Sequence, residues 1–116
     1  PARWATIVEG LSRFAGRALE VDQDVYASAM ATNHRNRELA RLVNERGLLG
    51  CDVDEAVERY TRQCSLRVRA VDLATMGATL ADGGVEPRTG VRVVSEAACH
   101  ATLAVMAAAG SEGGPT

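Results

Sequence analysis

Apolar positions recur at helical spacing from the start of the chain, and this pattern predicts a first helix. Trp4, Ile7, Val8 and Leu11 fall three or four residues apart, and side chains with that spacing share one face of an α-helix. Gly16 is placed to end the helix, because glycine readily adopts the left-handed conformation that follows a last helical turn.

Polar residues that can cap a helix indicate three further helix starts. Asp22, Asn33 and Asp52 each precede a run with helical periodicity, and their side chains can accept hydrogen bonds from the first free backbone N–H groups. Asp52 and Glu55 also have the spacing of a capping box. The apolar residues of the helix after Asn33 that are expected to point inward are Leu39, Leu42 and Val43.

The second half of the chain alternates between helix and short irregular pieces. Residues 65–69 alternate with a period of two, typical of an extended connector, and the helical period returns over residues 70–82 until two glycines break it. Residues 85–90 contain Pro and Gly and are predicted to turn, residues 91–94 to be extended, and Ser95 to cap a last helix.

The pattern as a whole predicts a mostly α chain with five or six helices and little strand. Leu103 and Met106 are placed on the apolar side of the last helix, and residues 110–116 are predicted to be loop. At 116 residues the chain is one domain at most. Because Pro1 already stands inside a helical pattern, we expect the chain to be a fragment of a longer protein.

The charged residues exclude several functions. All 13 basic residues are arginines and the net charge is −2, so a nucleic-acid partner is not expected. Without lysine the chain cannot supply a Schiff-base lysine, a P-loop lysine or a Ser-x-x-Lys dyad. No apolar run approaches the length of a membrane span, so no membrane partner is expected either.

Three widely spaced cysteines, Cys51, Cys64 and Cys99, bear on the compartment and on metals. No Cys-x-x-Cys pair occurs, which disfavours a zinc ribbon, and no cofactor or metal is expected. Free thiols in an odd number favour a reducing, cytoplasmic setting.

Two polar concentrations and one Cys-His pair are candidates for chemistry. Tyr60, Gln63 and Cys64 share one face near a helix end, where they either orient a polar ligand or merely finish the helix. Asn36 falls in the first turn of a helix, where N–H groups favour an anion such as a carboxylate. Cys99 and His100 are adjacent, so they point about 100° apart and make a poor metal site.

Taken together, three segments resemble the serine-dependent glutaminases of the β-lactamase-like type. The first is Tyr26-x-Ser28 followed by Arg35-Asn36, and the second is Tyr60-x-x-Gln63-Cys64-Ser65-Leu66. The third runs from Asp72-Leu73-Ala74 through Gly83-Gly84 to Pro87-x-Thr89-Gly90-x-Arg92-Val93. Their order and spacing match the family across most of the chain.

The resemblance implies an activity and a fold. Members hydrolyse L-glutamine to L-glutamate and ammonia through a serine acyl-enzyme, and the serine belongs to a Ser-x-x-Lys motif upstream of the matched region. Residues 1–116 would then be a single helical segment of a glutaminase domain, lacking the nucleophile and the C-terminal part. The implied fold is the helical part of an α/β serine β-lactamase/DD-peptidase-like architecture, and the chain alone is expected to be inactive.

Two substrate-binding residues of the family have matching residues in this chain, and a third is replaced. Asn36 matches an asparagine that holds the amino-acid end of the substrate, and Tyr60 matches a tyrosine of the same pocket. The family has Glu after the Tyr-x-Ser motif, facing the substrate's α-ammonium, and this chain has Ala29 there. A lost charge-assisted contact costs about 1.5–3 kcal/mol. The alanine at position 29 has three alternative explanations: an engineered change, an altered substrate specificity or a turn misaligned with the family pattern.

Other functions stay open at this point. A non-enzymatic helical module for interaction or amino-acid sensing is favoured by Ala29, and Cys-dependent hydrolysis through Cys64 or Cys99 lacks a nameable base. If a sheet outside the chain covers these helices, the chain exposes apolar surface. We then expect it to be marginally stable alone and to associate with the rest of the enzyme or as a homo-oligomer.

Overall fold

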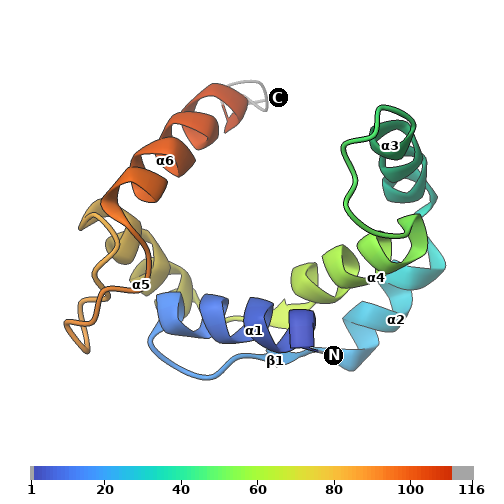
Figure 1. Ribbon diagram of the computed structural model, residues 1–116. Coiled ribbons are helices and arrows are strands. Elements are labelled where there is room, and N and C mark those ends of the chain that lie inside the picture. The colour runs from blue at the N-terminus through green and yellow to red at the C-terminus, as the bar shows by residue number, and fades with distance from the viewer. Residues whose placement is uncertain (1, 111–116) are drawn as a thin grey trace. The chain divides into compact units, whose positions relative to one another are not determined.

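The computed structural model describes residues 2–110, and its regular structure is almost entirely α-helical (Figure 1). The helices are α1 (Ala2–Ala15), α2 (Gln23–Ala31), α3 (His34–Glu45), α4 (Val53–Cys64), α5 (Ala70–Ala81) and α6 (Glu96–Gly110). The strands β1 (Glu20–Val21) and β2 (Leu66–Arg67) pair antiparallel, with Glu20 opposite Arg67. The predicted mostly α chain is therefore confirmed over the described residues.

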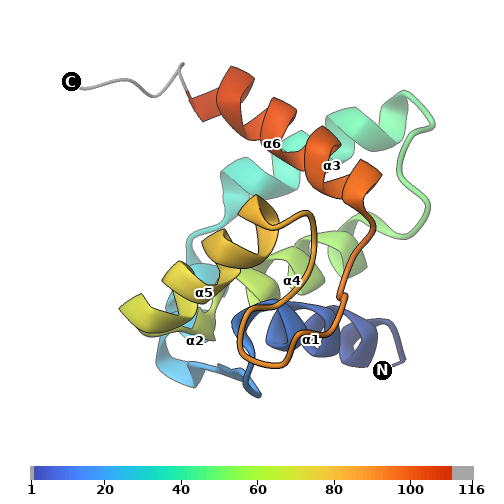
Figure 2. The ribbon, with the colours of Figure 1, turned by 90° about the vertical axis from the view of Figure 1, so that its left-hand side faces the viewer.

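The chain divides into two compact units, Pro1–Val8 with Leu19–Arg67, and Glu9–Ala18 with Val68–Thr116. In the first unit α4 packs against both α2 and α3. In the second unit α5 packs against α6, and Figure 2 shows the loop between them folding back on itself before α6 begins. An isolated bridge from Val85 to Arg92 closes that loop as a short hairpin, which fits the predicted turn and extended pieces.

Side-chain caps begin three helices as the sequence predicts. Asp22 Oδ1 accepts hydrogen bonds of 3.1 Å from two backbone N–H groups in the first turn of α2. Asp52 does the same for α4, at 3.0 and 3.4 Å. Ser95 Oγ accepts from the Ala98 N–H at 3.1 Å. Each bond satisfies a backbone donor that the helix itself leaves unpaired.

Asn33 departs from its predicted role. It occupies the cap position of α3, but its side chain makes no capping hydrogen bond. Its Nδ2 instead donates to Thr61 Oγ1 on α4 at 3.0 Å. The prediction that the Asn33 side chain caps α3 is wrong, because a buried acceptor on a neighbouring helix uses the amide.

The predicted inward direction of several apolar residues is also wrong. Leu39 and Leu42, predicted to point inward, are 59% and 48% exposed. Leu103 and Met106, predicted to lie on the apolar side of the last helix, are 41% and 55% exposed, so much of that side is in solvent. A helix that packs on one or two neighbours leaves its remaining apolar side in solvent, which periodicity cannot foresee. The buried apolar residues are mostly small: Ala15, Leu19, Val57 and Cys99.

A buried carboxylate organises the second unit. Asp72 is fully buried and accepts hydrogen bonds from Arg17 Nε at 2.8 Å and from Arg17 Nη2 at 2.6 Å. Arg69 Nη2 adds a contact of 3.2 Å from the start of the same helix. The hydrogen bonds from Arg17 and then Arg69 hold the pKa of Asp72 far below its usual value. This ion cluster fixes the end of α1 against the start of α5.

The loop that follows α5 is built around a second buried carboxylate, Glu86. It accepts from the Arg88 N–H at 3.0 Å and from both the N–H and the hydroxyl of Thr89 at 2.8 Å. Burial raises the pKa of Glu86, but these donors outweigh it and leave the pKa below its ordinary value. Gly16 makes room for this carboxylate, since a Cβ there would lie 2.7 Å from Glu86 Oε1.

Replacing Gly84 by Ala is expected to lower the free energy of unfolding by about 1–2 kcal/mol. Gly84 has a φ of +100°, and a Cβ would collide with the Val94 carbonyl oxygen, next to the hydrogen bond between Val93 N–H and Gly84 O. Gly77→Ala is the matched control, because beyond its chain neighbours and the backbone of α5 itself no atom lies within 4 Å of the position that its Cβ would take. Gly77→Ala should raise the free energy of unfolding by about 0.5–1 kcal/mol, because alanine favours helix more than glycine does. Denaturant unfolding measures the free energy of unfolding of both variants. A Gly84→Ala variant as stable as the original chain would contradict the expectation.

The last helix extends further than predicted. Gly110, expected to begin the terminal loop, is the last residue of α6. The rest of that predicted loop, residues 111–116, lies outside the described residues. Over residues 2–110, no helix has both the length and the apolar character needed to cross a membrane.

Candidate functional site

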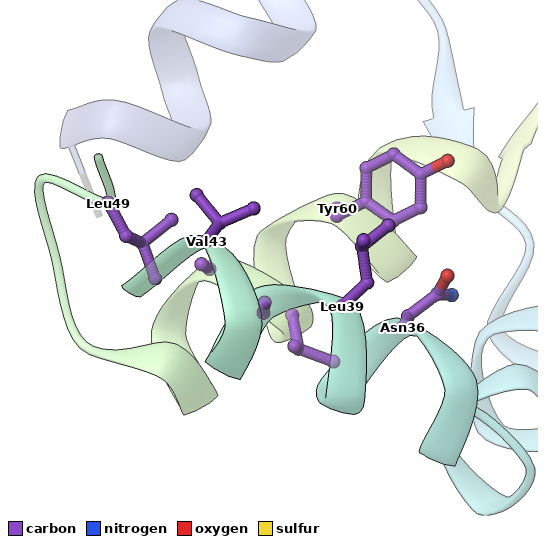
Figure 3. A pocket seen from close by; sticks show the side chains of 8 residues that line it. Asn36, Leu39, Val43, Leu49 and Tyr60 are labelled. Carbon is purple, nitrogen blue, oxygen red and sulfur yellow. The ribbon is translucent and has the colours of Figure 1, made fainter. Parts of the chain in front are cut away.

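A pocket lies between α3 and α4 in the first unit, and it contains both residues predicted to bind substrate. Its volume is about 330 Å³. None of its lining residues carries a charge; they are Asn36, Leu39, Ala40, Val43, Leu49, Ala56, Val57 and Tyr60. Figure 3 shows the Asn36 carboxamide and the Tyr60 hydroxyl at the same end, while Val43 and Leu49 lie toward the other.

The two polar residues come from opposite helices. Asn36 is in the first turn of α3, and Tyr60 lies one turn before the end of α4. Both are neutral groups that donate and accept, so the pair can orient a polar ligand by direction without adding charge. The apolar wall beyond them suits an aliphatic portion of the ligand.

Two kinds of contact hold α3 on α4. Arg37 forms an ion pair with Asp54, whose side chain is 75% exposed. Asn33 and Thr61 form the buried hydrogen bond described above. An exposed ion pair contributes little because water and salt screen it, whereas the hydrogen bond between Asn33 and Thr61 is shielded from water.

The hydroxyl of Tyr60 lies beside the thiol of Cys64, one helical turn later. A hydrogen bond with the Cys64 thiol raises the pKa of Tyr60 above its ordinary value. Tyrosine is protonated at neutral pH even with its ordinary pKa of about 10, so the hydroxyl can donate to a ligand. Cys64 itself is exposed, and Gln63 beside it is exposed too.

Ser65, the residue after Cys64, supports the end of α4. It is buried, its hydroxyl donates to Thr61 O at 2.8 Å, and its carbonyl accepts from the Asp22 N–H at 2.8 Å. It thus joins the end of α4 to the start of α2.

Ala29, where the resemblance implies an acidic residue, lies half-buried on α2 and is not part of the pocket lining. Tyr26 lies one turn earlier on the same helix, and its hydroxyl donates to Glu58 on α4 at 3.1 Å. The Ala29 side chain offers no acceptor. The pocket and this position therefore provide nothing negative to face an ammonium group.

The alternative cysteine and histidine candidates do not come together. Cys99 is buried at 1% exposure, whereas the adjacent His100 side chain is 76% exposed and pairs with Glu96 at 4.0 Å. His34 is exposed on α3. Among residues 2–110, no cluster of three or more His, Cys, Asp or Glu side chains is placed to hold a metal ion.

Two parts of this site escaped the sequence patterns. The apolar wall was attributed to the core, since Leu39 and Val43 follow the helical period of buried residues. Thr61 went unnoticed between Tyr60 and Gln63, although it follows Val57 by one turn and so shares its buried face.

Comparisons with known proteins agree with this picture. A family model described as Glutaminase matches residues 1–113. "Glutaminase 2" of Yersinia pestis is 56% identical over 108 residues, covering 93% of this chain and 32% of that protein. The glutaminase of Mycobacterium marinum is 47% identical over 104 residues, 90% of this chain and 32% of its own length. This chain thus spans about a third of the length of these relatives.

Solved structures give the same result. A crystal structure of Mglu superposes with a TM-score of 0.85 at 40% identity, over 90% of this chain and 26% of that one. A probable glutaminase of Bacillus subtilis gives 0.85 at 27% identity, over 90% and 34%. The predicted fold class, the helical part of a serine β-lactamase-like architecture, is confirmed by these neighbours.

Proposed function

The chain belongs to the glutaminase family, and from this premise we propose that it forms the substrate-gripping helical part of an enzyme that hydrolyses L-glutamine to L-glutamate and ammonia. The chemistry needs a nucleophile that this lysine-free chain does not contain as a Ser-x-x-Lys motif. In the proposal a serine elsewhere in the protein attacks the side-chain carboxamide, and ammonia leaves from the resulting tetrahedral species. Water then cleaves the γ-glutamyl ester and frees the serine.

Asn36 and Tyr60 have the binding role in this reaction. Asn36 Nδ2 donates to the α-carboxylate of the substrate. The protonated Tyr60 hydroxyl, on the facing helix, donates to the same non-reacting end of the substrate. Both hold the non-reacting end of the substrate and so present its carboxamide to the nucleophile. Neither residue takes part in proton transfer.

One observation carries the proposal. The two residues that the resemblance assigns to the substrate stand 24 positions apart in the sequence, yet both line one pocket and lie at the same end of it (Figure 3). One solved relative, Mglu, is described in an L-glutamate binding form, with a TM-score of 0.86 to this chain. Both facts support glutamine as substrate and glutamate as product.

Asn36→Ala is expected to raise the KM for glutamine roughly ten- to a hundredfold in the intact protein that contains this chain, because one hydrogen bond to a charged group is worth about 1.5–3 kcal/mol. The kcat should change little, since the contact is made equally before and during reaction. Release of ammonia from glutamine measures both constants. Asn44→Ala, exposed on the same helix and outside the pocket lining, is the control.

The proposal fails if the intact protein releases no ammonia from glutamine and binds none by calorimetry, with either Ala29 or Ala29→Glu. It also fails if Asn36→Ala and Tyr60→Phe both leave the KM unchanged.

A second candidate function is favoured by Ala29. A helical module that senses an amino acid without hydrolysing it has no need for the acidic residue that grips a free α-ammonium. Titration of glutamine, glutamate and a glutamine derivative lacking a free amine separates the two functions. Binding of the blocked derivative alone, unaffected by Asn36→Ala, would favour the sensing module.

We also propose that the chain associates with the remaining part of the same enzyme or with itself, and that it works in the cytoplasm. Exposed apolar side chains on α3 and α6 support association, and three free cysteines support a reducing compartment. Sedimentation of the chain at micromolar concentration should show species larger than a monomer. A monodisperse, cooperatively melting monomer would contradict the first proposal.

A further inference from the structure

The Asn33 side chain is turned away from the helix that it begins. Asp22 and Asp52 stand at equivalent cap positions and accept hydrogen bonds from their own helices. The Asn33 carboxamide instead reaches α4, where Nδ2 donates to Thr61 Oγ1 at 3.0 Å. Asn33 is 8% exposed and Thr61 is 3% exposed, so this hydrogen bond is shielded from water.

The chemistry of Thr61 dictates which partner it needs. Its hydroxyl proton is committed to Val57 O at 2.7 Å, one turn earlier in α4. Only the lone pairs of Oγ1 are left for another partner, so the partner must be a donor. The Asn33 amide group supplies that donor. Its Nδ2 has a second N–H, which donates to Met30 Sδ at 3.6 Å.

The position of this hydrogen bond connects it to the pocket. Asn33 precedes Asn36 by about one helical turn, and Thr61 directly follows Tyr60. The loop that joins α3 to α4 covers residues 46–52 and lies at the opposite ends of both helices. That loop therefore does not constrain the Asn36–Tyr60 end of the helix pair. At this end α2, which leads into α3, packs on α4, and the Asn33–Thr61 hydrogen bond joins α3 to α4.

We propose that Asn33 and Thr61 are positioning residues that set the spacing of Asn36 and Tyr60 and thereby the affinity for substrate. The inference rests on the proposed function, because it takes these two residues to be the substrate contacts. Neither Asn33 nor Thr61 is part of the pocket lining, so they act only through Asn36 and Tyr60.

The test uses the intact protein and three threonine variants. Thr61→Val keeps the shape but removes the acceptor, and it should raise the KM for glutamine roughly tenfold with kcat within about twofold. Thr61→Ser keeps the hydroxyl and should restore the KM to within about twofold. Thr75→Val is the matched control: Thr75 is also buried, and its hydroxyl likewise donates one turn back, to Val71 O, but this hydrogen bond stays within α5. It should leave the KM unchanged.

Asn33→Ser approaches the same bond from the other helix. Serine is a good cap for α3, yet it is too short to reach Thr61, so this variant should stay folded and still raise the KM to the same extent. Because both changes remove one interaction, the double variant should match either single variant within about twofold.

Three results are decisive. The inference is overturned if Thr61→Val and Asn33→Ser lower the midpoint of thermal unfolding but leave the KM at its original value. The hydrogen bond would then stabilise the fold without affecting substrate binding. The inference is also overturned if Thr61→Ser, which keeps the hydroxyl, raises the KM as much as Thr61→Val does. If Asn36→Ala and Tyr60→Phe raise the KM but these variants do not, only this inference falls and the proposed function stands.

Discussion

Replacing Asp72 by Asn is expected to lower the midpoint of thermal unfolding by on the order of 10 °C. The carboxylate is fully buried, and its two oxygens accept two hydrogen bonds from the Arg17 guanidinium and three from Arg69, one of them from the Arg69 backbone N–H. Its removal leaves the Arg17 guanidinium, which is only 33% exposed, without its countercharge. Breaking a shielded ion cluster in this way is far more damaging than losing an exposed pair.

Glu9→Gln is the matched control, because it removes the carboxylate of the Arg13–Glu9 pair, whose side chains are 61% and 65% exposed. The control should shift the midpoint by no more than about 2 °C. Helical circular dichroism during heating measures both variants. Equal shifts in Asp72→Asn and Glu9→Gln would contradict the expectation.

The same carboxylate predicts a pH dependence. Arg17 and then Arg69 lower the pKa of Asp72 in the folded chain, so the unfolded chain takes up the proton at a higher pH than the folded chain. The stabilisation is complete above the ordinary pKa of about 4 and is lost as the pH falls toward the lowered value. The difference in midpoint between the original chain and Asp72→Asn should therefore narrow below about pH 4. A difference that widens in acid would contradict this assignment.

Restoring an acidic residue with Ala29→Glu is expected to tighten glutamine binding by roughly ten- to a hundredfold, which corresponds to about 1.5–3 kcal/mol. The new carboxylate would accept from the α-ammonium of the substrate, a charge-assisted contact that the uncharged pocket lining does not provide. The helix should tolerate the change, since Ala and Glu both favour helix. Isothermal titration of the intact protein with glutamine measures the gain.

Two controls isolate the role of the charge at position 29. Ala27→Glu places the same side chain at an exposed position of α2 and should leave the affinity unchanged. N-acetyl-L-glutamine has no ammonium group, so its binding should not improve in Ala29→Glu. Equal gains for both ligands would mean that the carboxylate acts through something other than the amine.

Helix positions were predictable from the sequence because their signals are local. Asp22, Asp52 and Ser95 act within one turn of their own helices, and Gly16 adopts the positive φ expected after a helix end. The direction of Leu39 was not predictable, because whether an apolar side faces solvent depends on segments distant in the sequence.

The site was predictable in part, and the source of the information was not periodicity. Asn36 and Tyr60 were named through the family resemblance, and the structure brings them to one pocket, while their binding role stays a prediction. The Asn33–Thr61 hydrogen bond joins residues 28 positions apart, and a local pattern assigned Asn33 to a cap. Competition between a local and a distant partner is decided only by packing.

The placement of the aromatic residues has a consequence for optical measurements. Trp4 is the single tryptophan; it lies beneath the Arg62 guanidinium at 5.0 Å, and both tyrosines also belong to the first unit. The second unit holds the single phenylalanine, Phe14, as its only aromatic side chain. Intrinsic tryptophan emission therefore reports directly on the first turns of α1 and their contact with Arg62, and it senses the second unit only through α1, whose later turns belong to that unit.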